Sequence, residues 1–149
     1  MKTRLGWVIL PLAGMALFAG ACGGGGGDDE EGQVQTLGNR TFSDHGTTDV
    51  TGKADAEIEA DSFYFEPTFL RGEPGQKMTI KVGNDSNALH NFSISSMKID
   101  TDIPAEGSAQ IEVTFPQTGA LVFFCKYHSA QGMNGELLAG DAQPQAANS

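Results

Sequence analysis

The chain has 149 residues and a formal net charge of −10 at pH 7, a length that fits one compact domain with extensions. The acidic balance argues against nucleic-acid binding, because contacts with a phosphate backbone require clustered Lys and Arg. The 20 glycines and the short runs of strand-forming residues argue against a helical bundle.

Residues 1–21 are typical of a secretory signal segment. Lys2 and Arg4 precede an apolar run from Leu5 to Gly20, and the segment ends on small residues at Ala21. The apolar run is shorter than the roughly 18 residues expected of a membrane-spanning helix, and its glycines and proline weaken it further. The sequence therefore predicts an exported protein, located in a periplasm or on a cell surface.

Cleavage after Ala21 would leave Cys22 as the first residue of the exported chain. The string FAGACGGGG resembles a bacterial lipobox, which implies a lipid on Cys22 and anchoring to a bacterial membrane. The alternative is an ordinary cleavage site of small residues, Ala19-Gly20-Ala21, which cuts the same bond. Cys125 is expected to stay unbridged, because a lipidated Cys22 at the chain end is a poor disulfide partner.

Three segments follow the signal. Residues 22–55 are rich in Gly, Asp, Thr and Ser and lack apolar periodicity, which predicts a flexible Gly-rich and acidic tether. Residues 56–140 contain short β-type segments separated by Gly, Pro, Asn and Asp, and they form the predicted domain. Residues 141–149 are predicted to be a disordered tail.

The strands of the predicted domain are recognised by alternation and by aromatic residues. The segments AEIEADSFYF, KMTIKVGN, NFSIS and AQIEVTF each place apolar side chains on one face. The segment GALVFFC is apolar on both faces, and we expect it to be the most buried strand. Strands about ten residues apart, with turns between them, predict an all-β sandwich.

A cluster of potential metal ligands follows this apolar segment. Cys125, His128 and Met133 form the pattern C-x2-H-x4-M. Taken singly, a buried cysteine is more often a core thiol, and a methionine more often fills a gap in a core. Taken together, thiolate, imidazole and thioether select a soft transition metal. His90 stands at the start of a strand and completes a His2Cys set with a weak axial Met, the arrangement of blue-copper centres.

On these residues the domain resembles the cupredoxins of the plastocyanin and pseudoazurin type, over about residues 56–138. The resemblance implies a Greek-key β-sandwich in which the side chain of Asn91 ties its strand to the ligand loop. The family often has Ser or Thr after the cysteine, where this chain has Lys126 and Tyr127. The resemblance also implies one type 1 copper ion per chain, with the ligands His90, Cys125, His128 and Met133.

The implied function is single-electron transfer between redox partners by an exported, membrane-tethered blue copper protein. The alternative is an extracytoplasmic copper carrier or scavenger that transfers the ion itself, and a metal-free structural domain would tolerate loss of Cys125. Copper oxidases and nitrite reductases of this fold need a further copper with its own histidines, and His45 is the one histidine left over. We therefore predict that the protein is not an enzyme.

The family analogy also suggests a docking partner. It implies that His128 lies nearest the surface and serves as the electron port, with small residues such as Ala130 beside it. The acidic charge favours a basic redox partner, such as a c-type cytochrome or an oxidase domain. We expect the protein to be a monomer.

Overall fold

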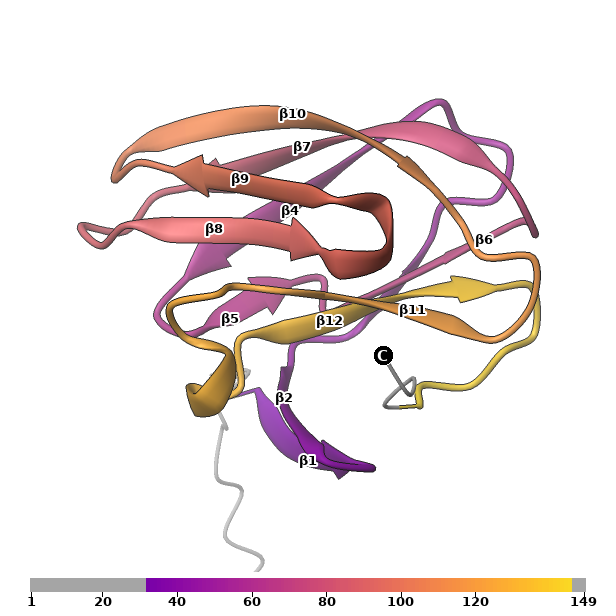
Figure 1. Cartoon of the computed structure of the whole chain (residues 1–149), viewed down its shortest axis with the longest axis horizontal. Helices are drawn as coiled ribbons and strands as arrows, with labels where there is room; N and C mark the ends of the chain where they lie inside the picture. Colours follow the sequence, from indigo (N-terminus) through magenta and orange to yellow (C-terminus); the bar gives the residue numbers. More distant parts are fainter. Residues whose placement is uncertain (1–31, 146–149) are drawn as a thin grey trace, which may run out of the picture.

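The structure, a computed structural model, describes residues 32–145, which form strands joined by turns (Figure 1). Two single-turn 3₁₀ helices are the only helical elements of these residues, and neither could span a membrane. The elements are β1 (Gln33–Leu37), β2 (Arg40–Asp44), β3 (Thr47–Asp49), β4 (Asp55–Asp61), β5 (Tyr64–Glu66), β6 (Phe69–Gly72), β7 (Lys77–Asn84), β8 (His90–Ile94), η1 (Ser95–Met97), β9 (Ile99–Ile103), β10 (Gly107–Thr114), β11 (Ala120–Phe124), η2 (Ser129–Gln131) and β12 (Asn134–Ala139). The predicted all-β class is confirmed.

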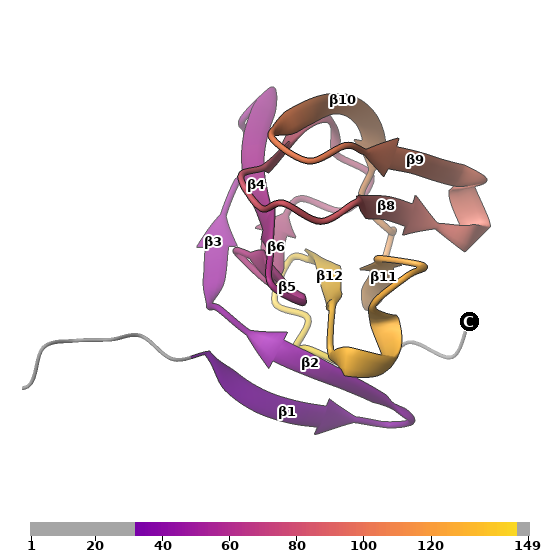
Figure 2. The ribbon, with the colours of Figure 1, turned by 90° about the vertical axis from the view of Figure 1, so that its left-hand side faces the viewer.

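The two larger sheets form a sandwich, seen in Figure 2 from one end. One has four strands in the order β10-β7-β4-β5, and the other has six in the order β3-β6-β12-β11-β8-β9. Parallel pairs, β4 with β7 and β6 with both β3 and β12, occur beside antiparallel ones. The chain crosses from one sheet to the other several times, so strands distant in sequence become neighbours.

The core lies between these sheets and follows the predicted alternation. In β7 the side chains of Met78, Ile80 and Val82 are buried and Lys77 and Lys81 are exposed. β10 buries its apolar residues in the same way and pairs with β7 along its whole length. An amphipathic strand with period two buries one face and leaves the other to solvent, which is the pattern seen here.

The prediction that GALVFFC is the most buried strand is wrong. β11 has two buried residues, whereas every residue of β8 and of β12 is buried. β12 lies between β6 and β11 in the six-stranded sheet. Leu138 on β12 packs in a second apolar cluster with Phe42 and Phe69, and Phe42 belongs to a segment that the sequence did not assign to the domain.

That segment, residues 32–55, differs from the expected tether. β1 and β2 form an antiparallel hairpin in full register, from Gln33 opposite Asp44 to Leu37 opposite Arg40. β3 joins the six-stranded sheet beside β6, and the side chains of Phe42 and Val50 are 0% and 1% exposed. The folded domain therefore begins before residue 56, while residues 22–31 of the expected tether lie outside the described residues.

The C-terminal segment also makes more contacts than a disordered tail would. The Arg71 guanidinium donates to the carbonyl oxygen of Ala142 at 2.8 Å, and Ala142 packs against the second apolar cluster. The backbone N–H of Gln145 donates to Glu136 Oε2 at 2.8 Å. Residues 146–149, like the predicted signal segment 1–21, lie outside the described residues.

Candidate metal centre

His90 is the first residue of β8 and lies at the end of the sandwich where β11 finishes (Figure 1). Pairing between the two strands places Phe124 opposite Ser93. The residue that follows β11 is Cys125, so the strand register brings Cys125 to the strand that begins with His90. Both side chains are 0% exposed.

The loop after β11 closes on itself through backbone hydrogen bonds. The N–H groups of His128 and Ser129 donate to the carbonyl oxygen of Cys125 at 3.1 and 2.8 Å. The N–H of Cys125 donates to the carbonyl oxygen of Met133 at 3.0 Å, and the N–H of Met133 donates to that of His128 at 3.2 Å. Gly132 permits this reversal because its φ is +105°, a conformation that side chains rarely adopt.

Three potential ligand atoms converge at this end of the sandwich. One donor atom from each of His90, Cys125 and His128 lies within 4.8 Å of the other two. Cys125 Sγ is 3.5 Å from His128 Nδ1, and the two imidazole rings have centroids 5.0 Å apart. A thiolate and two imidazoles are suited to a soft transition metal and poorly suited to calcium or magnesium.

The surroundings of His90 favour the neutral imidazole over the protonated one. Its Nδ1 atom is buried and has no hydrogen-bond partner within the described part of the chain. Burial lowers the pKa of His90, and the nearby His128 lowers it further, against a smaller opposing effect of Asp61. Desolvation disfavours the charged imidazolium, and the neutral ring is the form that ligates metals. The residues present thus fit a metal ion at this position.

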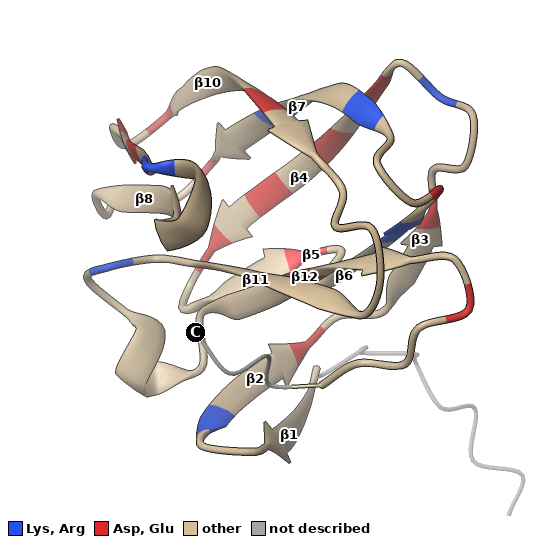
Figure 3. Cartoon of the chain, turned by 45° about the vertical axis from the view of Figure 1, so that its right-hand side comes forward, with Lys and Arg blue, Asp and Glu red and all other residues tan. Residues whose placement is uncertain are grey.

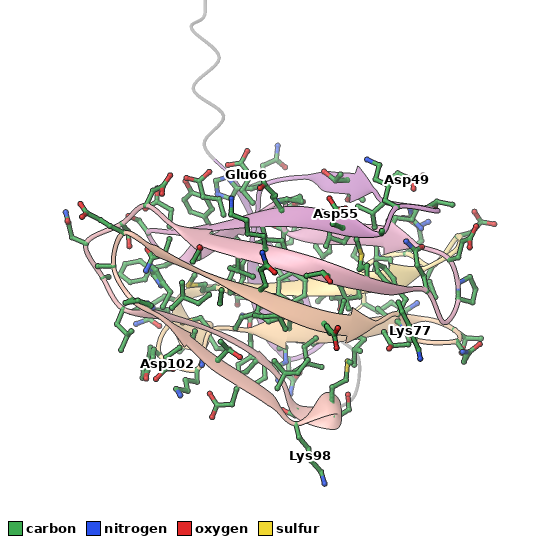
Figure 4. The ribbon with its side chains drawn as sticks, turned by 90° about the horizontal axis from the view of Figure 1, so that it is seen from above. Asp49, Asp55, Glu66, Lys77, Lys98 and Asp102 are labelled. Carbon is green, nitrogen blue, oxygen red and sulfur yellow. The ribbon has the colours of Figure 1, made fainter. Side chains whose placement is uncertain are left out.

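Asn91 and two carboxylates connect the ligand loop to the β8–β9 hairpin. Asn91 Oδ1 accepts a hydrogen bond from the N–H of Lys126 at 3.3 Å. Asn91 Nδ2 donates to Asp100 and Asp102 at 2.8 and 2.9 Å. The Lys126 ammonium lies 2.8 Å from each carboxylate, and the Tyr127 hydroxyl donates to Asp102 at 3.0 Å. Figure 4 shows Asp102 at the outer edge of the molecule.

This arrangement changes the pKa values of both acids. It also gives partners to Lys126 and Tyr127, which stand where the family often has Ser or Thr. Hydrogen bonds from Lys126, followed by those from Asn91, lower the pKa of Asp100 and of Asp102. The same two carboxylates raise the pKa of Lys126. Lys126 and Tyr127 therefore attach the first residues of the ligand loop to β9.

Two exposed aromatic side chains lie beside His128. Phe63 and Tyr127 are 44% and 43% exposed. The Phe63 ring has its centroid 4.8 Å from that of His128, and Tyr127 is the neighbour of His128 in sequence. His128 itself is half-buried. The site is thus closed around His90 and Cys125 and reaches solvent beside His128.

The β1–β2 hairpin supports the ligand loop from the other side. The N–H of Ser43 donates to the carbonyl oxygen of Gly132 at 2.9 Å. Asn134 Nδ2 donates to the carbonyl oxygen of Thr41 at 2.7 Å and receives a hydrogen bond from Arg40 at 3.2 Å on its Oδ1. Sequence reasoning missed these residues. The available signal was Gly38-Asn39 between two alternating runs, a pair typical of a two-residue hairpin turn.

The remaining predicted residues are placed as follows. Met133 is 0% exposed and belongs to the same closed loop. Its role as axial ligand stays a prediction. Cys22 lies outside the described residues. His45, the histidine left over in the sequence, stacks on Tyr64 with ring centroids 3.7 Å apart and is not part of the ligand group.

Comparison with known proteins gives a consistent result. Residues 40–139 match the family model described as a cupredoxin-like domain. Halocyanin of Natronomonas pharaonis is 29% identical over 112 residues, which cover 71% of this chain and 69% of the relative.

Two solved structures share the fold. Reduced auracyanin of Roseiflexus castenholzii has a TM-score of 0.51 at 19% identity and covers 59% of this chain and 98% of its own. The metal-binding domain of the Cu(I)-exporting P-type ATPase CopA of Streptococcus pneumoniae D39, solved with Cu(I), has a TM-score of 0.54 at 15% identity, covering 65% of this chain and 98% of its own. Both are shorter than this chain.

Proposed function

The chain belongs to the cupredoxin-like domain family, and from this membership we propose that it is an exported blue copper protein that passes single electrons between redox partners. Members of the family typically transfer electrons. The observation that carries the proposal is the convergence of His90, Cys125 and His128 within 4.8 Å at a buried end of the sandwich. One copper ion per chain fits this group.

The proposed ligands are chosen by their chemistry and by their surroundings. Cys125 and Met133 would supply soft sulfur donors, and His90 and His128 would supply imidazoles, the set found in blue-copper centres. When bound, copper would supply one-electron chemistry by alternating between its cuprous and cupric states. Binding requires the Cys125 thiol to release its proton, so copper affinity is expected to fall as the pH is lowered.

The chain's own residues would hold the ligands in one geometry and exclude water. His90, Cys125 and Met133 are fully buried, and the carboxylate pair on β9 and the β1–β2 hairpin fasten the ligand loop from two sides. Outer groups of this kind orient the ligands, and the apolar surroundings control solvent access. A site that rearranges little is suited to a carrier that only gains and loses an electron.

The surface beside His128 is the proposed docking site for a partner. Phe63 and Tyr127 provide exposed aromatic surface beside it. Figure 3 shows acidic residues along β4 and β5, the strands joined by the turn that carries Phe63. This charge favours a basic partner, such as a c-type cytochrome or an oxidase domain, and electrostatic steering of that kind weakens as salt is added.

Export and membrane tethering complete the proposal. The predicted signal segment and the lipid on Cys22 would hold a monomeric domain at the outer side of a bacterial membrane. Fractionation of cells that produce the full chain or its Cys22→Ser variant tests this step. The native chain is expected with the membranes and the variant in the soluble extracytoplasmic fraction, and recovery of both in the soluble fraction would contradict the anchor.

A copper carrier is the second candidate, because the metal-binding domain of the CopA exporter shares the fold. No catalytic step is proposed, since the chain has three histidines and two of them already belong to the ligand group. A carrier should release its ion readily to an acceptor, whereas an electron carrier should retain it through many redox cycles.

Stopped-flow mixing distinguishes the two candidates. The reduced, copper-loaded protein is mixed either with an oxidised basic c-type cytochrome or with a cuprous chelator. Electron exchange much faster than copper loss is expected. An Ala130→Lys variant should slow the exchange, because Ala130 is exposed on the ligand loop and the added positive charge would repel the basic cytochrome. Rapid copper loss with slow electron exchange would instead support the carrier.

A further inference from the structure

We propose that Ser86 is a positioning residue for the metal centre: its hydroxyl accepts the Nε2 proton of His90 and thereby turns the Nδ1 lone pair toward Cys125 and His128. Ser86 Oγ lies 3.0 Å from His90 Nε2. The inference rests on the proposed metal centre. It adds the residue that decides which ring nitrogen of His90 is available as a ligand.

The first step is the orientation of Asn84, the last residue of β7. Its side chain is 0% exposed. Its Nδ2 atom is surrounded by acceptors, since it lies 2.8, 3.0 and 3.0 Å from the carbonyl oxygens of Ala88, Ile103 and Pro104. A carboxamide oxygen cannot take this place, because it has no proton to donate and would face only other acceptors. Asn84 Oδ1 must therefore point the other way, as an acceptor.

The second step is the hydroxyl of Ser86. Ser86 Oγ lies 2.8 Å from Asn84 Oδ1, and the N–H of Ser86 donates to the same oxygen at 3.0 Å. Because Asn84 Oδ1 can only accept, the single hydroxyl proton of Ser86 is directed to it. The two lone pairs of Oγ remain, and a serine hydroxyl can accept two hydrogen bonds with them. The N–H of Ala88 uses one at 3.2 Å.

The third step is the imidazole of His90. The remaining lone pair of Ser86 Oγ faces His90 Nε2, so Nε2 carries the proton and donates it. A neutral imidazole has one N–H, so Nδ1 is then an acceptor. This is the atom that is buried without a partner among the described residues, and one ring nitrogen of His90 lies within 4.8 Å of the donor atoms of Cys125 and His128. The chain from Asn84 through Ser86 thus leaves one nitrogen of His90 free for a metal.

A purely structural role for Ser86 makes a different prediction. Ser86 also closes the turn between β7 and β8 through its contacts with Asn84 and Ala88. If that were its whole role, loss of the hydroxyl would lower stability but leave the imidazole proton of His90 where it was. The location of that proton therefore separates a positioning role from a structural one.

The test uses nitrogen-15 NMR of the metal-free protein at a pH where His90 is neutral, followed by competition titration with cupric ion. In the native chain we expect the His90 proton on Nε2, exchanging slowly with water. In Ser86→Ala that proton should exchange rapidly and the second tautomer should appear, with cupric affinity lower by about 10–100-fold. Ser86→Thr keeps the hydroxyl and should restore both properties, and the exposed Ser96→Ala serves as the matched control.

Three results would overturn the inference. A native His90 with its proton on Nδ1 would do so without any variant, even if Ser86→Ala failed to fold. The same conclusion would follow from a Ser86→Ala protein with native proton exchange and affinity, or from a Ser86→Thr protein as impaired as Ser86→Ala. Because the NMR spectrum is recorded without metal, it tests the hydrogen-bond chain separately from the copper spectrum that tests the proposed function.

Discussion

Replacing Phe42 by alanine tests whether the N-terminal hairpin is part of the folded domain. The Phe42 ring is 0% exposed and packs against Phe69, with ring centroids 5.7 Å apart, and against Leu138. Truncating a fully buried phenylalanine costs about 3–5 kcal/mol, through lost transfer free energy and the cavity left behind. In a domain of this size such a loss lowers the melting temperature by roughly 10–20 °C.

The assay is urea unfolding of the metal-free protein, followed by circular dichroism. The matched control is Val34→Ala on the same hairpin, because Val34 is 72% exposed and exposed substitutions change stability by less than about 0.5 kcal/mol. If Phe42→Ala lost less than about 1 kcal/mol, or unfolded at the midpoint of the control, residues 32–55 would be a tether as the sequence suggested.

Three further predictions concern the core, the carboxylate pair and the thiol. Gly135→Ala should destabilise the protein by about 1–3 kcal/mol, because the added Cβ would overlap the buried Phe123 ring and the carbonyl oxygen of Thr68. Gly83→Ala is the control, since an added Cβ meets nothing there, and similar unfolding midpoints for the two variants would contradict the prediction. The folded-state pKa values of Asp100 and Asp102 lie below the ordinary 3.8. The stability that the two ionised carboxylates add to the fold is therefore fully present above pH 3.8, and it is lost as the pH falls through the lowered pKa values. The Asp100→Asn/Asp102→Asn double variant should therefore show a weaker loss of stability in acid, and an unchanged pH profile would count against the ion-pair network. Cupric affinity measured by competition should decrease with falling pH in the native protein, because binding releases the Cys125 proton, and a pH-independent affinity would argue against thiolate ligation.

The grouping of the predicted ligands could be expected from the sequence because most of its geometry is local. Cys125, His128 and Met133 lie within one loop that closes by its own backbone hydrogen bonds. His90 is distant in sequence. Its position at the start of a strand nevertheless places it near the loop, since β8 pairs with the strand that ends before Cys125. Fold class followed from the period-two alternation of β7 and β10, which needs no tertiary information.

The hairpin could not be assigned to the domain from composition alone. Its strands are mainly polar, and the one large apolar residue of β2, Phe42, is buried only because Phe69 and Leu138 form the cluster that receives it. The full burial of β12 also depends on tertiary structure, because β12 lies between β6 and β11 in the six-stranded sheet. Asp100 and Asp102 were not predicted to contact the ligand loop, because their meeting with Lys126 depends on the register between β8 and β9.

The central claim is that Cys125 is a copper ligand. The most direct measurement is the visible absorption and electron paramagnetic resonance spectrum of the protein after addition of cupric ion, with Cys125→Ala as the control. The account predicts an intense thiolate-to-copper absorption band and narrow copper hyperfine splitting in the native protein, both absent from the variant. A colourless native protein, or identical spectra for the two proteins, would contradict the proposed blue-copper centre.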